Sequence, residues 1–258
     1  MILNKTVLHT PSYILRRRII LHLLRRYKPG SFLEIGCGRG ELLPHLARLG
    51  FDGVGLEISP EVFSRARQIV RPHEPNLSIV TDAGEIEGKR FQYVFAFEVL
   101  EHIEDDVGAL VEWRKWIAPG GHLMISVPAH MKSWTASDDA VGHYRRYEHD
   151  ALRRLLENCG YLVDVFWSYG FPLTSLTRRA RPFFYRSRSE VFQGKSKQDR
   201  TLHSSLESTL DLSQWRTLAR CMSSVMEGIG FTFHVSQLAF RQLDVGDGYI
   251  VACRTADC

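Results

Sequence analysis

The sequence predicts an α/β protein with a doubly wound, mostly parallel sheet of seven strands and a helical insertion before the last strand. Two observations lead to this prediction. Short apolar segments alternate with helical patterns between residues 31 and 127, which is typical of a parallel sheet covered by helices on both faces. A long stretch of helical and polar segments then separates the sixth predicted strand from the seventh.

The first expected element is an amphipathic helix from Pro11 to Tyr27, because apolar residues recur there at helical spacing and arginines occupy the remaining face. Alternating strands and helices follow it, and the residues Pro119, Gly120 and Gly121 supply the turn into the fifth strand. The strands are expected at 31–36, 53–58, 77–81, 92–97 and 121–127, with helices at 40–49, 60–71 and 104–117.

The second half of the chain is less regular. After an aromatic and histidine-rich loop, a helix is expected at 148–159, a sixth strand at 161–168 and the last strand at 248–254. The intervening residues have helical patterns at 172–184 and 205–228, around a polar and basic stretch that is typical of a lid or of partial disorder. The predicted units are an N-terminal helix (1–28), a ligand-binding core (29–168), a helical insertion over the acceptor pocket (169–246) and a final strand with its tail (247–258).

The composition is that of an ordinary globular protein, with 44% hydrophobic and 24% charged residues in a chain of 258. The five cysteines form no CxxC pair and no disulfide framework, so neither a structural zinc site nor a secreted scaffold is indicated. Arginines interrupt the apolar N-terminal segment, which therefore fits neither a signal peptide nor a membrane span. A cytoplasmic protein is expected.

Positive charge is concentrated in two blocks. The first 33 residues contain no acid, and residues 178–200 contain eight Lys or Arg against two acids. Such blocks could face an anionic membrane surface, a phosphorylated substrate or nucleic acid. The alternative is a solvated basic face without a partner.

A glycine-rich turn follows the first strand of the core, in the segment Leu33 to Gly40, with the sequence LEIGCGRG. Glycine lets the backbone turn sharply and lets a ligand lie against bare main chain. The GxGxG spacing departs from the dinucleotide fingerprint GxGxxG, and the Lys and Ser/Thr of a phosphate loop are missing. Glu34 disfavours a pyrophosphate and suits a cationic, nucleoside-sized ligand.

Two further acids follow the next two strands. Glu57 is placed to accept hydrogen bonds from ribose hydroxyls, and Asp82 to accept one from an exocyclic adenine amine. Because ligands of open α/β sheets bind at the carboxyl ends of the strands, Glu34, Glu57 and Asp82 should converge on one crevice. Each acid taken singly could instead be a solvated residue or a helix cap.

Residues 31–127 resemble the class I S-adenosylmethionine-dependent methyltransferases, through FLEIGCGRG, GLEIS, TDA, VFAFEVLEHIED and APGGHLMISVP. The resemblance implies a Rossmann-like fold and S-adenosyl-L-methionine as the methyl donor, which leaves as S-adenosyl-L-homocysteine. It also implies that the backbone near Phe97 and Glu98 holds the methionine end of this cofactor. The predicted cofactor-binding residues are Glu34, Gly36, Gly38, Gly40, Glu57, Ile58, Asp82, Ala83, Phe97 and Glu98.

The later segments SVPAHMKSWTASDDAVGHYRRYEHDALRRLL, YGFPLTSLTRR and LDVGDGYIVACR look like a bacterial subgroup associated with glycosyltransferases or natural-product pathways. This resemblance implies a small-molecule, peptide or lipid-linked acceptor. Methyl transfer to a hydroxyl needs a base, for which His102 and His143 are candidates, with Tyr144 beside them. A carboxylate acceptor would need no base, and Arg145 or Arg146 would position it.

Glu98, Glu101 and His102 also resemble the metal-binding set of some RNA and quinone-precursor methyltransferases. Because the same residues occur in metal-free relatives, no metal ligands are assigned. His102 could instead cap the following helix, and Tyr144 could simply pack the loop.

Two other classes of function stay open. One is a nucleic-acid methyltransferase or binding protein that uses the basic blocks, although no Asn/Asp-Pro-Pro-aromatic motif and no RNA-binding appendage is found. The other is a scaffold that binds the cofactor without catalysis. The favoured prediction is methyl transfer to an oxygen of a biosynthetic intermediate.

Overall fold

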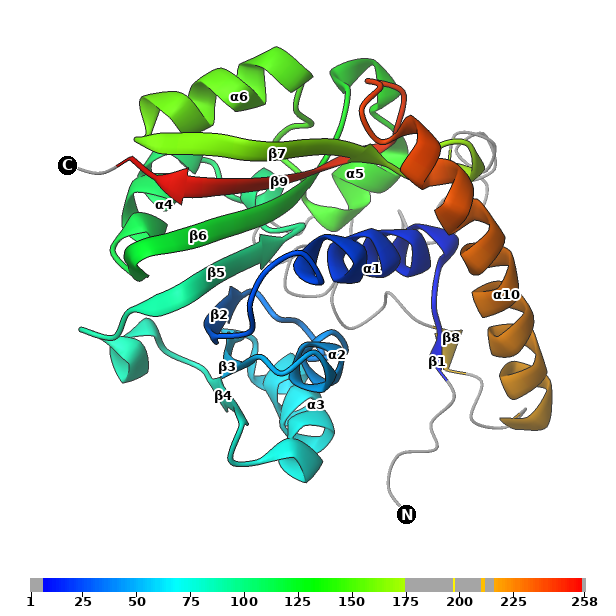
Figure 1. Cartoon of the computed structure of the whole chain (residues 1–258). Helices are drawn as coiled ribbons and strands as arrows, with labels where there is room; N and C mark the ends of the chain where they lie inside the picture. The colour runs from blue at the N-terminus through cyan, green and yellow to red at the C-terminus, as the bar shows by residue number, and fades with distance from the viewer. Residues whose placement is uncertain (1–6, 175–196, 198–209, 212–215, 257–258) are drawn as a thin grey trace.

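Seven strands of the described chain form one sheet, in the order β4-β3-β2-β5-β6-β9-β7 (Figure 1). The computed structural model describes residues 7–174, 197, 210–211 and 216–256. β9 runs antiparallel to β6 and β7, and the other neighbouring strands are parallel, which confirms the predicted fold class. The strands are β2 (Ser31–Ile35), β3 (Asp52–Leu56), β4 (Leu77–Val80), β5 (Phe91–Phe97), β6 (Ile117–Pro128), β7 (Tyr161–Tyr169) and β9 (Gly248–Thr255).

Alternate residues of the strands enter two separate cores, one on each face of the sheet. Leu33 packs in a core with residues of α4 and α6, whereas the preceding Phe32 packs in a core with residues of α1 and α2. This alternation is the period-two pattern of a strand buried on both faces. The helices are α1 (Pro11–Leu24), α2 (Leu43–Arg48), α3 (Pro60–Val70), α4 (Asp106–Arg114), α5 (Ala136–Val141), α6 (His149–Asn158) and α10 (Arg216–Phe240).

Helix α10 belongs to the segment inserted before β9 and packs against α1 (Figure 1). Arg17 and Arg18 of α1 both pair with Glu227. The Gln237 side chain donates to the Leu15 carbonyl at 3.1 Å. Part of the arginine face that the sequence leaves open to solvent or to an anionic partner is therefore used inside the molecule.

The structure differs from the sequence prediction mainly in the second half. Of the helix expected at 205–228, the described part is α10, which begins at Arg216 and continues to Phe240, while Leu210 and Asp211 belong to a strand instead. The short helix α5 was not predicted. A two-stranded antiparallel sheet of β1 (Val7–Leu8) and β8 (Leu210–Asp211) was also not predicted. The patterns at 175–196 and 198–209 lie outside the described residues. Among the described helices, none has the length and apolar character needed to cross a membrane.

Candidate functional site

The turn after β2 contains three glycines with positive φ angles, +62° at Gly36, +55° at Gly38 and +71° at Gly40. Most other residues would be strained in this conformation. A Cβ atom at Gly36 would lie 2.8 Å from Cγ2 of Val99, whereas a Cβ atom at Gly38 would have nothing within 4 Å. Gly38 thus presents bare main chain to open space, which a ligand could occupy.

Glu57 follows β3 and is fixed by the backbone of two neighbouring segments. Its Oε2 accepts the Gly38 N–H at 2.9 Å, and its Oε1 accepts the Ser59 N–H at 2.9 Å. Each carboxylate oxygen keeps a lone pair for a further donor, such as a ribose hydroxyl. Burial raises the pKa of Glu57, and the two backbone hydrogen bonds oppose that rise. The next side chain, Ile58, is 68% exposed and offers an apolar surface at the same edge.

Glu34 lies at the end of β2 and is buried, and its Oε2 has no hydrogen-bond partner among the described residues. Burial raises the pKa of Glu34 to about 8, and the charge of Arg16 opposes the rise. A buried carboxyl oxygen without a partner is costly unless a ligand supplies a donor. An ammonium group of a ligand would satisfy this oxygen and favour the ionised carboxylate.

Asp82 and Ala83 begin the 3-10 helix η2 (Ala83–Ile86), and Asp82 is exposed. Asp82 Oδ1 accepts the Gly84 N–H at 2.6 Å, so this residue does act as a helix cap. The cap leaves its second carboxylate oxygen for another donor. Asp82 follows β4, which pairs with β3, and so lies at the carboxyl edge of the sheet. Its hydrogen bond with an adenine amine stays a prediction.

Glu98 follows β5 and has a φ angle of +57°, which is rare for a residue with a side chain. Three side chains hold it there: Ser126 Oγ donates at 3.0 Å, Tyr169 OH donates at 2.9 Å, and Arg16 Nη1 lies 3.1 Å from Oε2. The preceding Phe97 is buried and stacks on Phe95. These three partners could not be predicted from the sequence, because they come from α1, β6 and β7, far apart in the chain.

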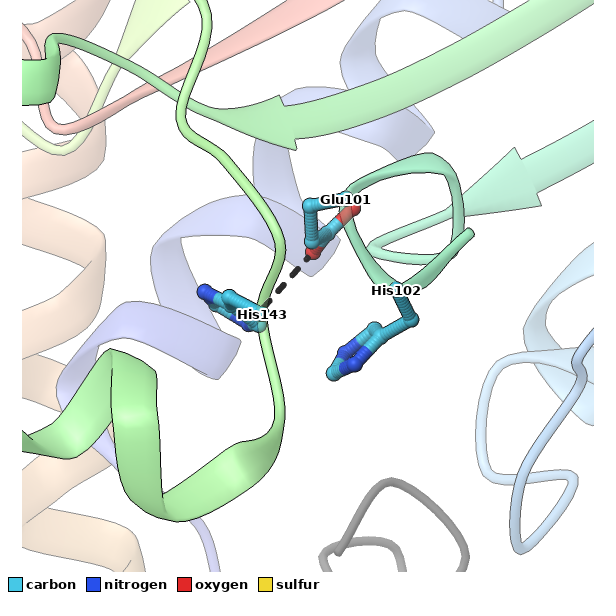
Figure 2. A group of neighbouring side chains, drawn as sticks. All are labelled: Glu101, His102 and His143. Atoms are coloured by element: carbon cyan, nitrogen blue, oxygen red, sulfur yellow. Dashed lines mark ion pairs between the residues drawn. The ribbon is translucent and has the colours of Figure 1, made fainter. Parts of the chain in front are cut away.

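Glu101, His102 and His143 form a cluster beyond the end of β5 (Figure 2). Glu101 and His102 extend from the turn η3 (Leu100–His102), and His143 comes from the segment after α5. His143 Nε2 lies 3.9 Å from Glu101 Oε1, and the two imidazole rings are 4.6 Å apart at their centroids. Asp105 is the residue that caps α4, so the prediction that His102 caps this helix is wrong.

The cluster is desolvated. Burial lowers the pKa of His102 to about 3, with a further contribution from His143, so His102 is neutral at physiological pH. Glu101 is fully buried, and neither of its side-chain oxygens has a hydrogen-bond partner among the described residues. Burial, together with the nearby Glu98, raises the pKa of Glu101 well above its ordinary value.

Asp138 of α5 fixes the orientation of His143. Its Oδ1 lies 2.9 Å from His143 Nδ1 and also accepts the Arg146 Nε–H at 2.9 Å. Burial alone would raise the pKa of Asp138, but the hydrogen bond with His143 and the charge of Arg146 lower it below its ordinary value. An ionised Asp138 holds a proton on Nδ1 and leaves Nε2 directed toward Glu101.

The two arginines expected to meet an acceptor carboxylate already have internal partners. Arg146 is buried and bonds Asp138 and the Ala129 carbonyl, while Arg145 bonds Asp106 and the Glu104 carbonyl. Tyr144 donates its backbone N–H to the Glu101 carbonyl at 2.8 Å, beside the cluster. The structure thus brings His102 and His143 together and directs both arginines elsewhere.

Comparisons with known proteins identify the family to which the chain belongs. Residues 8–164, more than half of the chain, match the family described as "Methyltransferase domain". A ubiquinone biosynthesis O-methyltransferase of Roseobacter denitrificans is 34% identical over 127 residues, 47% of this chain and 50% of that protein. Norajmaline N-methyltransferase of Rauvolfia serpentina is 25% identical over 185 residues, 65% of this chain and 62% of that protein. The chain thus spans about half to two thirds of the length of these two relatives.

Among solved structures, the [4+2]-cyclase SpnF superposes with a TM-score of 0.55 at 15% identity, over 92% of this chain and 81% of that one. This likeness concerns the fold alone. S-adenosylmethionine fits the residues at the carboxyl edge, because Gly38 leaves room against the main chain and the unpartnered Glu34 oxygen suits an ammonium group. The chain belongs to the class I S-adenosylmethionine-dependent methyltransferase domain family.

Proposed function

We propose that this protein transfers a methyl group from S-adenosylmethionine to an oxygen atom of a small-molecule, peptide or lipid-linked biosynthetic intermediate. The observation that carries the proposal is the cluster of the buried Glu101 with the partly buried His102 and His143, next to the end of β5. A hydroxyl acceptor must lose its proton during transfer, and such a cluster offers a site for that proton. The O-methyltransferase among the relatives supports an oxygen acceptor.

The cofactor, when bound, supplies an electrophilic methyl group on a sulfonium. The chain's own residues position it: Glu34 would take its ammonium group, Glu57 its ribose hydroxyls, and Asp82 its adenine amine. Ile58 and Ala83 would flank the adenine. Phe97 and Glu98 would hold the methionine end against the three glycines of the turn, Gly36, Gly38 and Gly40.

Within the cluster, His143 is the proposed proton acceptor. Its Nδ1 is committed to Asp138 at 2.9 Å, so Nε2 is the atom that can take the acceptor proton. Tyr144 lies next to it in the chain and is proposed to line the same acceptor site. The internal partners of Arg145 and Arg146 favour a hydroxyl over a carboxylate acceptor.

The acceptor is proposed to bind beside this cluster. The pairing of Arg17 and Arg18 with Glu227 makes a nucleic-acid partner for the N-terminal basic block less favourable, because it reduces the free positive charge of α1. Contact of the remaining basic residues with an anionic membrane surface stays a prediction.

A panel of phenols, aliphatic alcohols, carboxylic acids and amines, each incubated with the protein and labelled S-adenosylmethionine, tests the proposal. We expect label in a base-stable ether product. Label only in amines, or in esters of carboxylic acids, would contradict a hydroxyl acceptor. Binding of S-adenosylhomocysteine without turnover of any class would favour the non-catalytic scaffold.

A further inference from the structure

We propose that Glu101, His102 and His143 bind a divalent transition-metal cation. Each residue offers one ligand atom, and these three atoms all lie within 4.8 Å of one another (Figure 2). Ligand atoms of a tetrahedral zinc site lie about 3.4 Å apart, given bonds of about 2.1 Å. The largest separation would therefore shorten by up to about 1.4 Å around such an ion.

The strongest reason is the environment of Glu101. Its carboxyl group is 0% exposed, and both oxygens lack a hydrogen-bond partner among the described residues. The distance of 3.9 Å to His143 Nε2 is too long for a hydrogen bond. Burial of two unsatisfied acceptor oxygens is costly, and a bound cation between the three side chains would satisfy them.

In both histidines, a hydrogen bond from one ring nitrogen fixes the orientation of the imidazole, as is common for metal-binding histidines. His143 Nδ1 is 2.9 Å from Asp138 Oδ1, and Arg146 in turn holds Asp138. His102 forms a hydrogen bond with the backbone of Gly142. These contacts fix one nitrogen of each imidazole, and the second nitrogen of His143, Nε2, is the one that lies near Glu101.

The proposed ligand set does not include Glu98, which the sequence resemblance associated with a metal. Its carboxylate is held by Ser126, Tyr169 and Arg16 instead. Two imidazoles and one carboxylate favour Zn²⁺, Co²⁺ or Mn²⁺ over Mg²⁺ and Ca²⁺, which prefer oxygen ligands. Three protein ligands also leave coordination positions open for water or for an acceptor oxygen.

This inference rests on the proposed function and deepens it. With a cation bound, His143 Nε2 would be one of its ligands and could not accept a proton; the cation would take over that role by making a bound hydroxyl acidic enough to release its proton to water. Either way, the acceptor oxygen is expected at the same cluster. Metal binding can be measured without any acceptor, so the inference can be tested separately from turnover.

The full-length protein, stripped with a chelator, would be titrated with Co²⁺ by calorimetry and by visible absorption, and the Co²⁺ would then be displaced with Zn²⁺. We expect one ion per chain, a ligand-field spectrum without the thiolate charge-transfer band that cysteine ligands would cause, and displacement by Zn²⁺. E101Q and H143A should each weaken binding by about tenfold or more. H73A is the matched control, because His73 lies in η1 (Arg71–His73), outside the cluster, and should bind like the wild type.

S-adenosylhomocysteine binding by each variant verifies that it is folded. If E101Q fails this check, H102N and H143N decide the question with the same titration. Absence of Co²⁺ and Zn²⁺ binding, or equal affinity in the wild type and the cluster variants, would overturn the metal site. Retained S-adenosylhomocysteine binding in that case leaves the proposed function standing, whereas loss of it in the wild-type protein refutes the proposed function.

Discussion

The carboxyl edge of the sheet has two halves that are built differently. In the half formed by β2, β3 and β4, short-range features dominate: glycines with positive φ, a carboxylate bonded by backbone N–H groups, and a helix cap. In the half beyond β5 and β6, side chains from distant elements meet in a cluster around the buried Glu101. The first half is suited to holding a ligand by its shape, and the second to chemistry that depends on individual side chains.

The largest expected effect is a loss of turnover when a residue of the second half, the cluster beyond β5, is substituted. H143A should lower kcat by about 10²-fold to 10⁴-fold, because it removes a side chain that is proposed either to take the acceptor proton or to hold the cation that acidifies the acceptor. S-adenosylhomocysteine affinity should change little, since His143 lies outside the cofactor residues. Kinetics with an identified acceptor and calorimetry on the same variant provide the two measurements. The catalytic role of His143 is wrong if kcat is unchanged.

The next effect is the pH dependence of the unfolding free energy, which we attribute to Glu34 in the first half. The pKa of Glu34 is raised to about 8 by burial, so the folded state binds more protons than the unfolded state between about pH 4.5 and 8. Stability of the ligand-free protein should therefore fall as pH rises through this window. The variant E34Q should weaken that dependence, and the raised pKa of Glu101 should leave part of it in place. Denaturant unfolding from pH 5 to pH 8.5 measures the unfolding free energy across this window. An identical pH dependence in E34Q would show that Glu34 does not cause it.

A smaller effect distinguishes backbone strain at a glycine from loss of the open space beside it. G38A and G88A each place a Cβ atom at a positive φ with nothing within 4 Å, so both should cost about 1–2 kcal/mol of unfolding free energy. Only G38A should also weaken S-adenosylhomocysteine binding, because its methyl group enters the space proposed for the cofactor. Chemical denaturation and calorimetry on both variants test this pair. Equal affinities would show that the open space beside Gly38 is not the cofactor site.

The smallest effect is expected outside both halves. R17A removes a partly exposed ion pair with Glu227 that links α1 to α10. Such pairs contribute about 0–1 kcal/mol, and salt screens them further. Thermal unfolding at low and high salt should show a small, salt-sensitive loss. A loss of several kcal/mol would mean that the contact of α1 with α10 depends on this ion pair.

The same contrast explains what the sequence could predict. The mostly parallel sheet, the glycine turn and the position of Glu57 follow from periodicity and from motifs within a few residues of one another. The partners of Glu98 could not be predicted, because Arg16 and Tyr169 reach it only after α1 and β7 have packed on the sheet. Likewise, Asp138 lies in the unpredicted helix α5, so its support of His143 was not visible in the sequence.

Histidine and arginine side chains were the least predictable part of the site. His102 and His143 were both candidates, but their proximity to each other and to Glu101 depends on how the segment after α5 returns to η3. Arg145 carried an equally plausible role in the sequence, and the structure gives it Asp106 as a partner instead. Charge alone does not tell whether an arginine meets a ligand or an internal acid.

The central claim is that S-adenosylmethionine binds at the carboxyl ends of β2 and β3. Calorimetric titration of the wild-type protein and of E57A with S-adenosylhomocysteine tests it most directly. We expect one site per chain in the wild type and at least about tenfold weaker binding in E57A, because the ribose hydroxyls lose a charged acceptor. No binding to the wild type, or equal binding to both proteins, would contradict it.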